Sequence, residues 1–194
     1  APRRAGMLGA ALPKNILGPN PANPTGHWEP IRLIALHEKM LAEAGSSWDD
    51  WRPFDIGELG QSRATQFRAE IASLLEDEFG EAPLFVLKEP RISRFVPLYS
   101  ELLPAMGITP VYVNTFRNPL AIMQSLASRD DFTGAFSSLL WLRHELESER
   151  ATRGTPRVFV AYEELIADWR AVLANIDGTI KVSWPRPLPQ AAEE

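Results

Sequence analysis

Apolar residues recur with the spacing of an α-helix in the first half of the chain. In residues 30–44 and 60–81 they fall at Leu33, Leu36, Met40 and Leu41 and at Phe67, Ile71, Leu74, Leu75 and Phe79. Spacings of three and four residues gather such side chains on one helix face, which packs against a core. Gly45 and Gly80 are typical of residues that end a helix. The pattern therefore predicts two amphipathic helices.

The pattern changes after residue 83. Three short apolar runs, rich in β-branched and aromatic residues, are LFVLK (84–88), VYVNTF (111–116) and RVFVA (157–161). Helical patterns lie between and after them, at 93–107, 119–129, 136–150 and 162–176. Alternation of buried strands with helices predicts right-handed crossovers and a parallel sheet covered by helices on both faces. The fold class is therefore α/β.

Proline, asparagine and glycine dominate the N-terminal part of the chain. Residues 1–29 are dense in these turn-forming types, which predicts a loop region, and residues 178–194 form a proline-rich tail. With 194 residues, 45% of them hydrophobic, the chain fits a single domain over residues 1–194.

Composition narrows the function classes. A formal net charge of −5 argues against nucleic acid as the partner, and the absence of cysteine excludes thiol chemistry. No apolar run approaches the roughly 20 residues that span a bilayer, so we expect a cytoplasmic protein that does not enter a membrane.

Polar residues follow all three predicted strands. Lys88, Glu89 and Arg91 stand at or after the first, Arg117 after the second and Tyr162 after the third. Ligands of open parallel sheets bind beyond the carboxyl ends of the strands. We expect these side chains to converge around an anion.

The segment TFRNPLAIMQS has the features of a phosphate site. Asn118 and Pro119 suit the cap and first position of a helix, and Ser125 lies close to two turns beyond the cap, on the same face. Arg117 and Ser125 would then donate to one phosphate. Alternatively, Arg117 bonds loop carbonyls and Ser125 lies on the helix surface.

At these residues the chain resembles sulfotransferases that use 3′-phosphoadenosine 5′-phosphosulfate (PAPS). The strand followed by Arg-Asn-Pro, with Ser eight residues after the Arg, is similar to the family's 3′-phosphate motif. VLKEPR, FVAYEELIADWRAVLANI and GPNPANPTGHWEP are similar to further family segments. The resemblance runs from about Gly6 to about Ile176. It implies a P-loop-NTPase-like three-layer α/β/α fold with a central parallel sheet.

The resemblance also implies roles. Arg117 and Ser125 would bind the 3′-phosphate of PAPS or of its product, adenosine 3′,5′-bisphosphate. Tyr162 would lie near the adenosine, and Arg91 would also help to bind the cofactor. Lys88 would balance charge on the bridging oxygen as the sulfuryl group moves to a hydroxyl of a small molecule or glycan. No metal is required.

The acceptor hydroxyl needs a base. Glu29 is the first choice, followed by His27 and Glu89. Structural interpretations stay open: Glu29 caps the helix beginning at Pro30, His27 packs in the loop, and Lys88 pairs with Glu89 or another acid.

The family's first strand and 5′-phosphosulfate loop have no counterpart before GAALPKN, so we expect them to be missing or truncated. We therefore expect this chain to lack the half of the cofactor site that would hold the reactive sulfate, and to be incomplete or inactive. The alternative function is a non-catalytic nucleotide-binding or assembly module on the same scaffold. An uncovered sheet edge would favour a homodimer.

Overall fold

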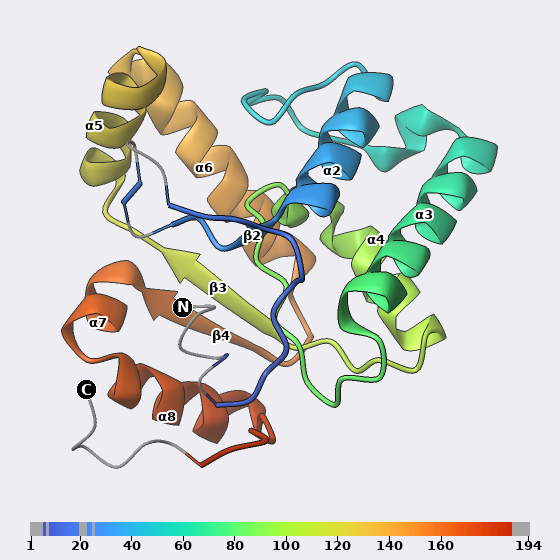
Figure 1. Ribbon diagram of the computed structural model, residues 1–194. Helices are drawn as coiled ribbons and strands as arrows, with labels where there is room; N and C mark the ends of the chain where they lie inside the picture. Colours follow the sequence, from blue (N-terminus) through green and yellow to red (C-terminus); the bar gives the residue numbers. More distant parts are fainter. Residues whose placement is uncertain (1–5, 7, 20–22, 25, 188–194) are drawn as a thin grey trace.

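A computed structural model describes residues 6, 8–19, 23–24 and 26–187, and within them the chain is a mixed α/β protein (Figure 1). The seven α-helices of this part are α2 (Ile31–Glu43), α3 (Gln61–Phe79), α4 (Ile92–Ala105), α5 (Pro119–Asp130), α6 (Gly134–Ala151), α7 (Tyr162–Ala167) and α8 (Trp169–Ile180). The strands are β1 (Ile16–Leu17), β2 (Glu29–Pro30), β3 (Tyr112–Phe116) and β4 (Arg157–Ala161), and a 3₁₀ turn, η1, spans Ile56–Leu59.

The predicted helices at 30–44, 60–81 and 119–129 correspond to α2, α3 and α5, with small differences at their ends. Their apolar spacing explains the agreement, because side chains on the predicted faces, such as Phe67 and Ile71, are fully buried.

One predicted helix, 162–176, is divided in two at Asp168. The backbone of Asp168 is extended (φ −150°), and its side chain accepts hydrogen bonds from the backbone N–H groups of Arg170 and Ala171. A short acidic side chain that caps a new helix competes with continuation of the old one. α8 then runs to Ile180, so the tail predicted from residue 178 begins at Lys181.

The parallel sheet of the described residues has two strands. β3 and β4 pair in register from Tyr112 with Arg157 to Phe116 with Ala161, as the sequence predicts for these two runs. Their carboxyl ends therefore lie side by side.

Residues 84–88 do not form a third regular strand. They make one parallel bridge, Phe85 with Ala11, in which the Ala11 N–H donates to the Leu84 carbonyl (2.8 Å) and the Val86 N–H donates to the Ala11 carbonyl (3.1 Å). The next donor in such a ladder is residue 13, and Pro13 has no N–H. The pairing stops there.

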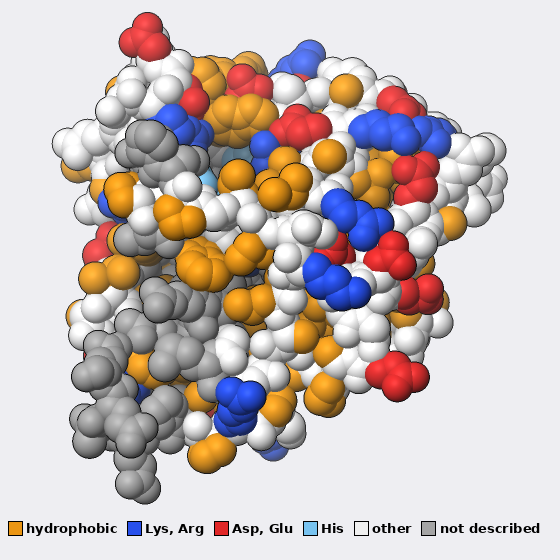
Figure 2. All heavy atoms as spheres, in the orientation of Figure 1, with side chains coloured by type: hydrophobic (Ala, Val, Ile, Leu, Met, Phe, Trp, Pro, Cys, Tyr) orange, Lys and Arg blue, Asp and Glu red, His pale blue; other side chains and the backbone are white. Residues whose placement is uncertain are grey.

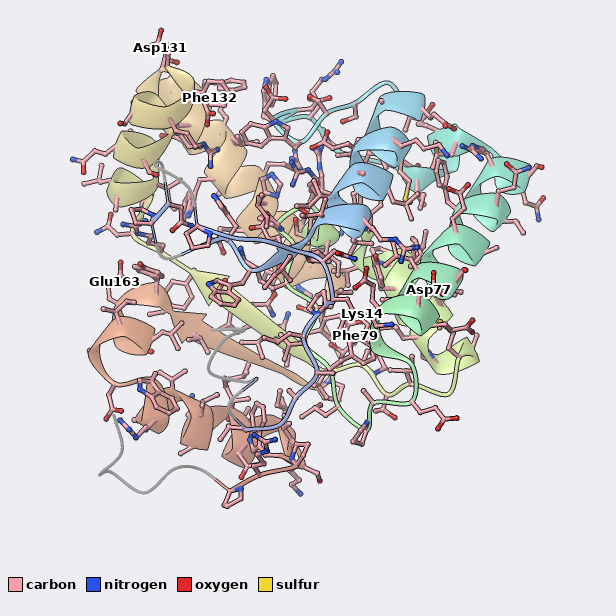
Figure 3. The ribbon with its side chains drawn as sticks, in the orientation of Figure 1. Lys14, Asp77, Phe79, Asp131, Phe132 and Glu163 are labelled. Atoms are coloured by element: carbon pink, nitrogen blue, oxygen red, sulfur yellow. The ribbon has the colours of Figure 1, made fainter. Side chains whose placement is uncertain are left out.

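The N-terminal region predicted as a loop is held in place by several contacts. β1 pairs antiparallel with β2, Ile16 opposite Pro30. The Lys14 backbone N–H donates to the Glu78 carboxylate (2.7 Å), and its ammonium group donates to the carbonyl of Asp77. Figure 3 shows Lys14 beside Asp77 and Phe79 at the end of α3. The described part of this region therefore packs against the helices and does not extend away from them.

Two hydrophobic clusters form the core. The larger joins α2, α3 and α4; the smaller joins β4, α8 and Leu8 (Figure 1). The α5–α6 hairpin stands next to the end of β3. Asn114 of β3 bonds Ser148 of α6 and Thr152, the residue that caps the C-terminus of α6. The expected cover on both sheet faces is incomplete, because Val113 and Phe159 remain 43% and 42% exposed.

Charged side chains of both signs alternate on the surface of α2 and α3. Figure 2 shows Lys and Arg next to Asp and Glu on this side of the molecule. The ion pairs include Lys39 with Glu70 (3.3 Å) and Arg63 with Glu43 (2.5 Å). Among the described residues, no helix is both long and apolar enough to cross a bilayer.

A buried arginine fastens the 44–55 loop to the helices. Arg94, in the first turns of α4, donates to the carbonyls of Ser47 (2.8 Å), Asp50 (2.6 Å) and Arg52 (2.8 Å) and pairs with Glu147 of α6 (3.2 Å). Its side chain is fully buried. A buried cation is tolerated only when its donors are satisfied, as they are here.

We expect Arg94→Met to lower the free energy of unfolding by about 3–5 kcal/mol, because it leaves Glu147 and three carbonyls without their donor. Arg68→Met, which removes an arginine from an exposed pair with Glu101, should cost no more than about 1 kcal/mol. Urea denaturation of both variants measures the difference. Equal losses would contradict a special role for Arg94.

Candidate functional site

Arg117 and Tyr162 lie together where the two parallel strands end. Each follows the last residue of its strand, and those last residues, Phe116 and Ala161, are partners in the sheet. The Arg117 guanidinium carbon lies 4.6 Å from the centre of the Tyr162 ring. A guanidinium over an aromatic face is held by a cation–π interaction and keeps its N–H groups free for another partner. We call this pair the arginine site.

The start of α5 completes the arginine site. Asn118 caps the helix, its side chain accepting from the Leu120 N–H (2.9 Å), and Pro119 is the first helical residue, as predicted. The Asn118 N–H donates weakly to the Glu163 carboxylate (3.4 Å), which comes from the first turn of α7 (Figure 3). The Glu163 carboxylate repels an anion, so the electrostatic attraction for an anion at this site comes from Arg117.

Within the described part of the chain, Arg117 donates no hydrogen bond to a carboxylate or carbonyl. Among these described residues, the structure therefore shows no loop carbonyl bound to Arg117, as the alternative interpretation requires. Ser125 is exposed on α5, and no contact between described residues joins it to Arg117. Its hydroxyl is accessible, and its part in a phosphate clamp stays a prediction.

A second polar group surrounds Lys88, at the end of the 84–88 segment. The Lys88 ammonium donates to the Glu29 carboxylate and to the backbone carbonyl of His27 (3.1 Å). Glu29 is only 6% exposed, whereas the Lys88 side chain is 41% exposed. The structure thus brings together Lys88, Glu29 and the backbone of His27, which we call the lysine site. Its acid is Glu29, so Lys88 pairs with another acid and not with Glu89.

Glu89 points the other way, into the helical core. One of its oxygens lies 2.5 Å from His37 Nδ1, and the other accepts from the Arg91 guanidinium (2.6 Å) and the Arg91 N–H (3.1 Å). Arg91 is also paired with Glu38. Both predicted site residues, Glu89 and Arg91, therefore bind each other and α2, and neither oxygen of Glu89 is open to an acceptor hydroxyl.

The pKa values in this network follow from burial and from its partners. Burial raises the pKa of Glu89, but the hydrogen bonds and charges of His37 and Arg91 outweigh it, so the pKa lies below its usual value. Burial, reinforced by the charge of Glu89, raises the pKa of Tyr99, whose hydroxyl lies 2.9 Å from His37 Nε2. Glu89 therefore stays ionised and Tyr99 protonated at neutral pH.

Sequence reasoning missed a contact between Ser93 and His144. The Ser93 hydroxyl lies 3.0 Å from His144 Nδ1, and the two residues are 51 positions apart. A serine in a first helical turn and a histidine within a helix carry no local signal of such a pair. The contact exists only because α4 and α6 pack together.

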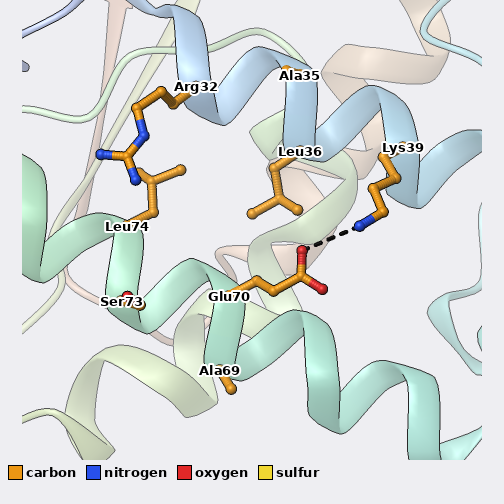
Figure 4. Close-up of a pocket in the computed structure, with 8 residues that line it drawn as sticks. All are labelled: Arg32, Ala35, Leu36, Lys39, Ala69, Glu70, Ser73 and Leu74. Atoms are coloured by element: carbon orange, nitrogen blue, oxygen red, sulfur yellow. Dashed lines mark hydrogen bonds and ion pairs between the residues drawn. The ribbon is translucent and has the colours of Figure 1, made fainter.

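A shallow groove of about 710 Å³ lies elsewhere, between α2 and α3 (Figure 4). Leu36 and Leu74 line it, and the Lys39–Glu70 ion pair crosses it. None of the predicted site residues lines this groove, and we assign it no function.

Comparisons with known proteins identify no relative of this chain. No family model matches the chain, and neither a curated protein nor a solved structure matches it.

The lowered pKa of Glu89 has a consequence for stability in acid. The folded state binds fewer protons here than the unfolded state, in which a glutamate titrates near about 4.3. The stabilisation is therefore complete above that pH and is lost as pH falls through the lower folded value. We expect Glu89→Gln to cost about 3–5 kcal/mol at pH 7 and progressively less below about pH 4.

Chemical denaturation between pH 7 and pH 2.5 measures this change, and Glu101→Gln, an exposed carboxylate paired with Arg68, is the control. A deficit of Glu89→Gln that is the same at every pH would show that ionisation of Glu89 does not stabilise the fold.

Proposed function

We propose that this protein is sulfotransferase-like and transfers a sulfuryl group from PAPS to a hydroxyl on a small molecule or glycan. The observation that carries the proposal is Arg117, a cation at the joined strand ends whose donors have no acceptor among the described residues. Resemblance of the segments around Arg117, Lys88 and Tyr162 to the sulfotransferase motifs supports the choice of nucleotide.

We also propose a more specific fold for the protein. The described sheet has parallel β3 and β4 with helices beside it, and Phe85 makes a separate parallel bridge with Ala11. We propose that 84–88 continues this sheet in a P-loop-NTPase-like three-layer arrangement. In such an arrangement the ligand lies beyond the carboxyl ends of the strands, where the arginine site stands.

The arginine site would hold the 3′-phosphate. A guanidinium presents a planar fork of donors that matches phosphate oxygens, and its cation–π contact with Tyr162 fixes the plane of that fork. The Ser125 hydroxyl adds one donor from α5. The exposed ring of Tyr162 offers a surface beside the adenosine.

The lysine site would serve the transfer itself. PAPS supplies an activated sulfuryl group. The acceptor oxygen bonds to sulfur as the bond from sulfur to the phosphate oxygen breaks, and the acceptor proton passes to the Glu29 carboxylate. Lys88 then turns from Glu29 toward the departing oxygen and neutralises its charge. Because Lys88 and Glu29 are already in contact, one ion pair supplies both the base and the cation.

A binding module without catalysis is the second candidate. The contact that favours it is the same ion pair, because a Glu29 carboxylate that keeps Lys88 as its partner does not take a proton from an acceptor. In that case the arginine site binds the nucleotide and no sulfuryl group moves.

We expect isothermal titration calorimetry to detect binding of adenosine 3′,5′-bisphosphate to the wild-type protein. Arg117→Ala should weaken it by about 1.5–3 kcal/mol, since a charge-assisted hydrogen bond to phosphate is lost, and Ser125→Ala by about 0.5–1.5 kcal/mol. Arg150→Ala removes an exposed arginine of α6 and should leave the affinity unchanged.

Wild-type protein that binds no nucleotide would overturn the assignment, as would an Arg117→Ala variant as tight as wild type. A sulfation assay with PAPS and a panel of phenol, alcohol and glycan acceptors separates the two candidates. Product that disappears in Lys88→Ala supports transfer, and nucleotide binding without product supports the module.

A further inference from the structure

Ser93 and His144 form a hydroxyl–imidazole pair outside both sites described above. Ser93 lies in the first turn of α4 and is partly exposed, and His144 lies in the middle of α6. The hydroxyl oxygen is 3.0 Å from His144 Nδ1, and the other ring nitrogen, Nε2, is 3.3 Å from the carbonyl oxygen of Trp48. A nucleophile, a base and a group that orients the base are therefore in line.

The Trp48 carbonyl decides where the ring proton sits. A carbonyl oxygen only accepts hydrogen bonds, so Nε2 must carry the hydrogen. In the neutral ring Nδ1 is then the unprotonated nitrogen, and its lone pair points at the Ser93 hydroxyl. His144 thus has the tautomer that a general base needs.

The surroundings keep His144 neutral. Burial lowers its pKa, the bond to Trp48 raises it, and among the charged groups that face the ring Arg94 and Arg91 lower it while Glu89 raises it; the net pKa lies below the ordinary value.

The Ser93 hydroxyl has one other acceptor, the carbonyl of Pro90 at 3.0 Å. A single hydrogen cannot serve both acceptors at once, so it exchanges between Pro90 and His144. Pro97, four residues on, has no N–H to bond the Ser93 carbonyl, so this turn of α4 lacks one of its usual restraints. Rotation of the hydroxyl about its Cβ–Oγ bond can therefore bring its hydrogen to either acceptor.

We infer that Ser93 is a nucleophile activated by His144 and able to take an acyl group from a carboxylic ester. The Ser93 oxygen bonds to the carbonyl carbon while its proton moves to His144 Nδ1. The carbonyl electrons move to oxygen and return as the bond to the leaving alkoxide breaks, and that alkoxide takes the proton from Nδ1. Water then attacks the acyl-serine with His144 again as base, which releases the acid and restores Ser93.

This activity is independent of the proposed sulfuryl transfer, because it uses neither Arg117 nor Lys88. Its test is covalent labelling. We expect a fluorophosphonate probe to lose fluoride and leave one adduct per chain, which peptide mapping locates at Ser93, and p-nitrophenyl acetate to give a burst of one p-nitrophenol per chain.

Two variants and a control test the roles. Ser93→Ala should not be labelled, and His144→Gln should be labelled about 100-fold or more slowly, since it keeps a polar side chain but cannot take the proton. Ser100→Ala, from the same helix but bonded to the Tyr112 hydroxyl, should label as wild type does. Thermal melting checks that each variant is folded.

Two measurements on the wild-type protein test the roles of Ser93 and His144 even if a variant does not fold. The labelling rate should rise with pH and level off once His144 is neutral, and ¹⁵N-resolved NMR should show the hydrogen on Nε2. No adduct, an adduct on another serine, undiminished labelling of folded His144→Gln, or a hydrogen on Nδ1 would each overturn the inference.

Discussion

The buried carboxylate of Glu89 is the constraint on which the centre of the molecule depends. It joins His37 of α2 to Arg91 at the start of α4, and both of its oxygens are used. Burying a charge is costly unless it is paired and hydrogen-bonded, so the chain at this turn has little freedom. The residue before it, Lys88, reaches Glu29 on β2, and the residues after it begin the helix that carries Ser93.

Helix α6 connects this turn to the rest of the fold. Successive parts of the helix bond two different elements: His144 contacts Ser93 and Glu147 pairs with Arg94, both of α4, and Ser148 bonds Asn114 of β3. Polar contacts of this kind depend on direction in a way that apolar packing does not. The position of the sheet relative to the helical core is therefore fixed by hydrogen bonds as well as by burial. The ends of β3 and β4, where Arg117 lies, are held at one side of the helical core.

Much of the local structure follows from the sequence, because it depends on neighbours along the chain. The helical periods of α2 and α3, the two runs that pair as β3 and β4, and the cap at Asn118 are of this kind. The meeting of Arg117 with Tyr162 also follows, since parallel pairing puts residues after two strands side by side.

The remaining features depend on contacts that no local pattern encodes. An apolar run at 84–88 suggests a strand, but pairing ends where its partner segment reaches Pro13. The direction of Glu89 is decided by a histidine 52 residues away, and the Ser93–His144 pair by the packing of two helices. Sequence reasoning therefore grouped Lys88 with Glu29, which it contacts in the structure, and also with Glu89, which faces the core.

We propose that Arg117 binds the 3′-phosphate of an adenosine nucleotide at the joined ends of β3 and β4. A crystal structure of the protein with adenosine 3′,5′-bisphosphate tests it most directly. We expect the 3′-phosphate within hydrogen-bond distance of the Arg117 guanidinium and the Ser125 hydroxyl, with the adenosine beside Tyr162. A nucleotide bound in the groove between α2 and α3, or with its 3′-phosphate away from Arg117, would contradict it.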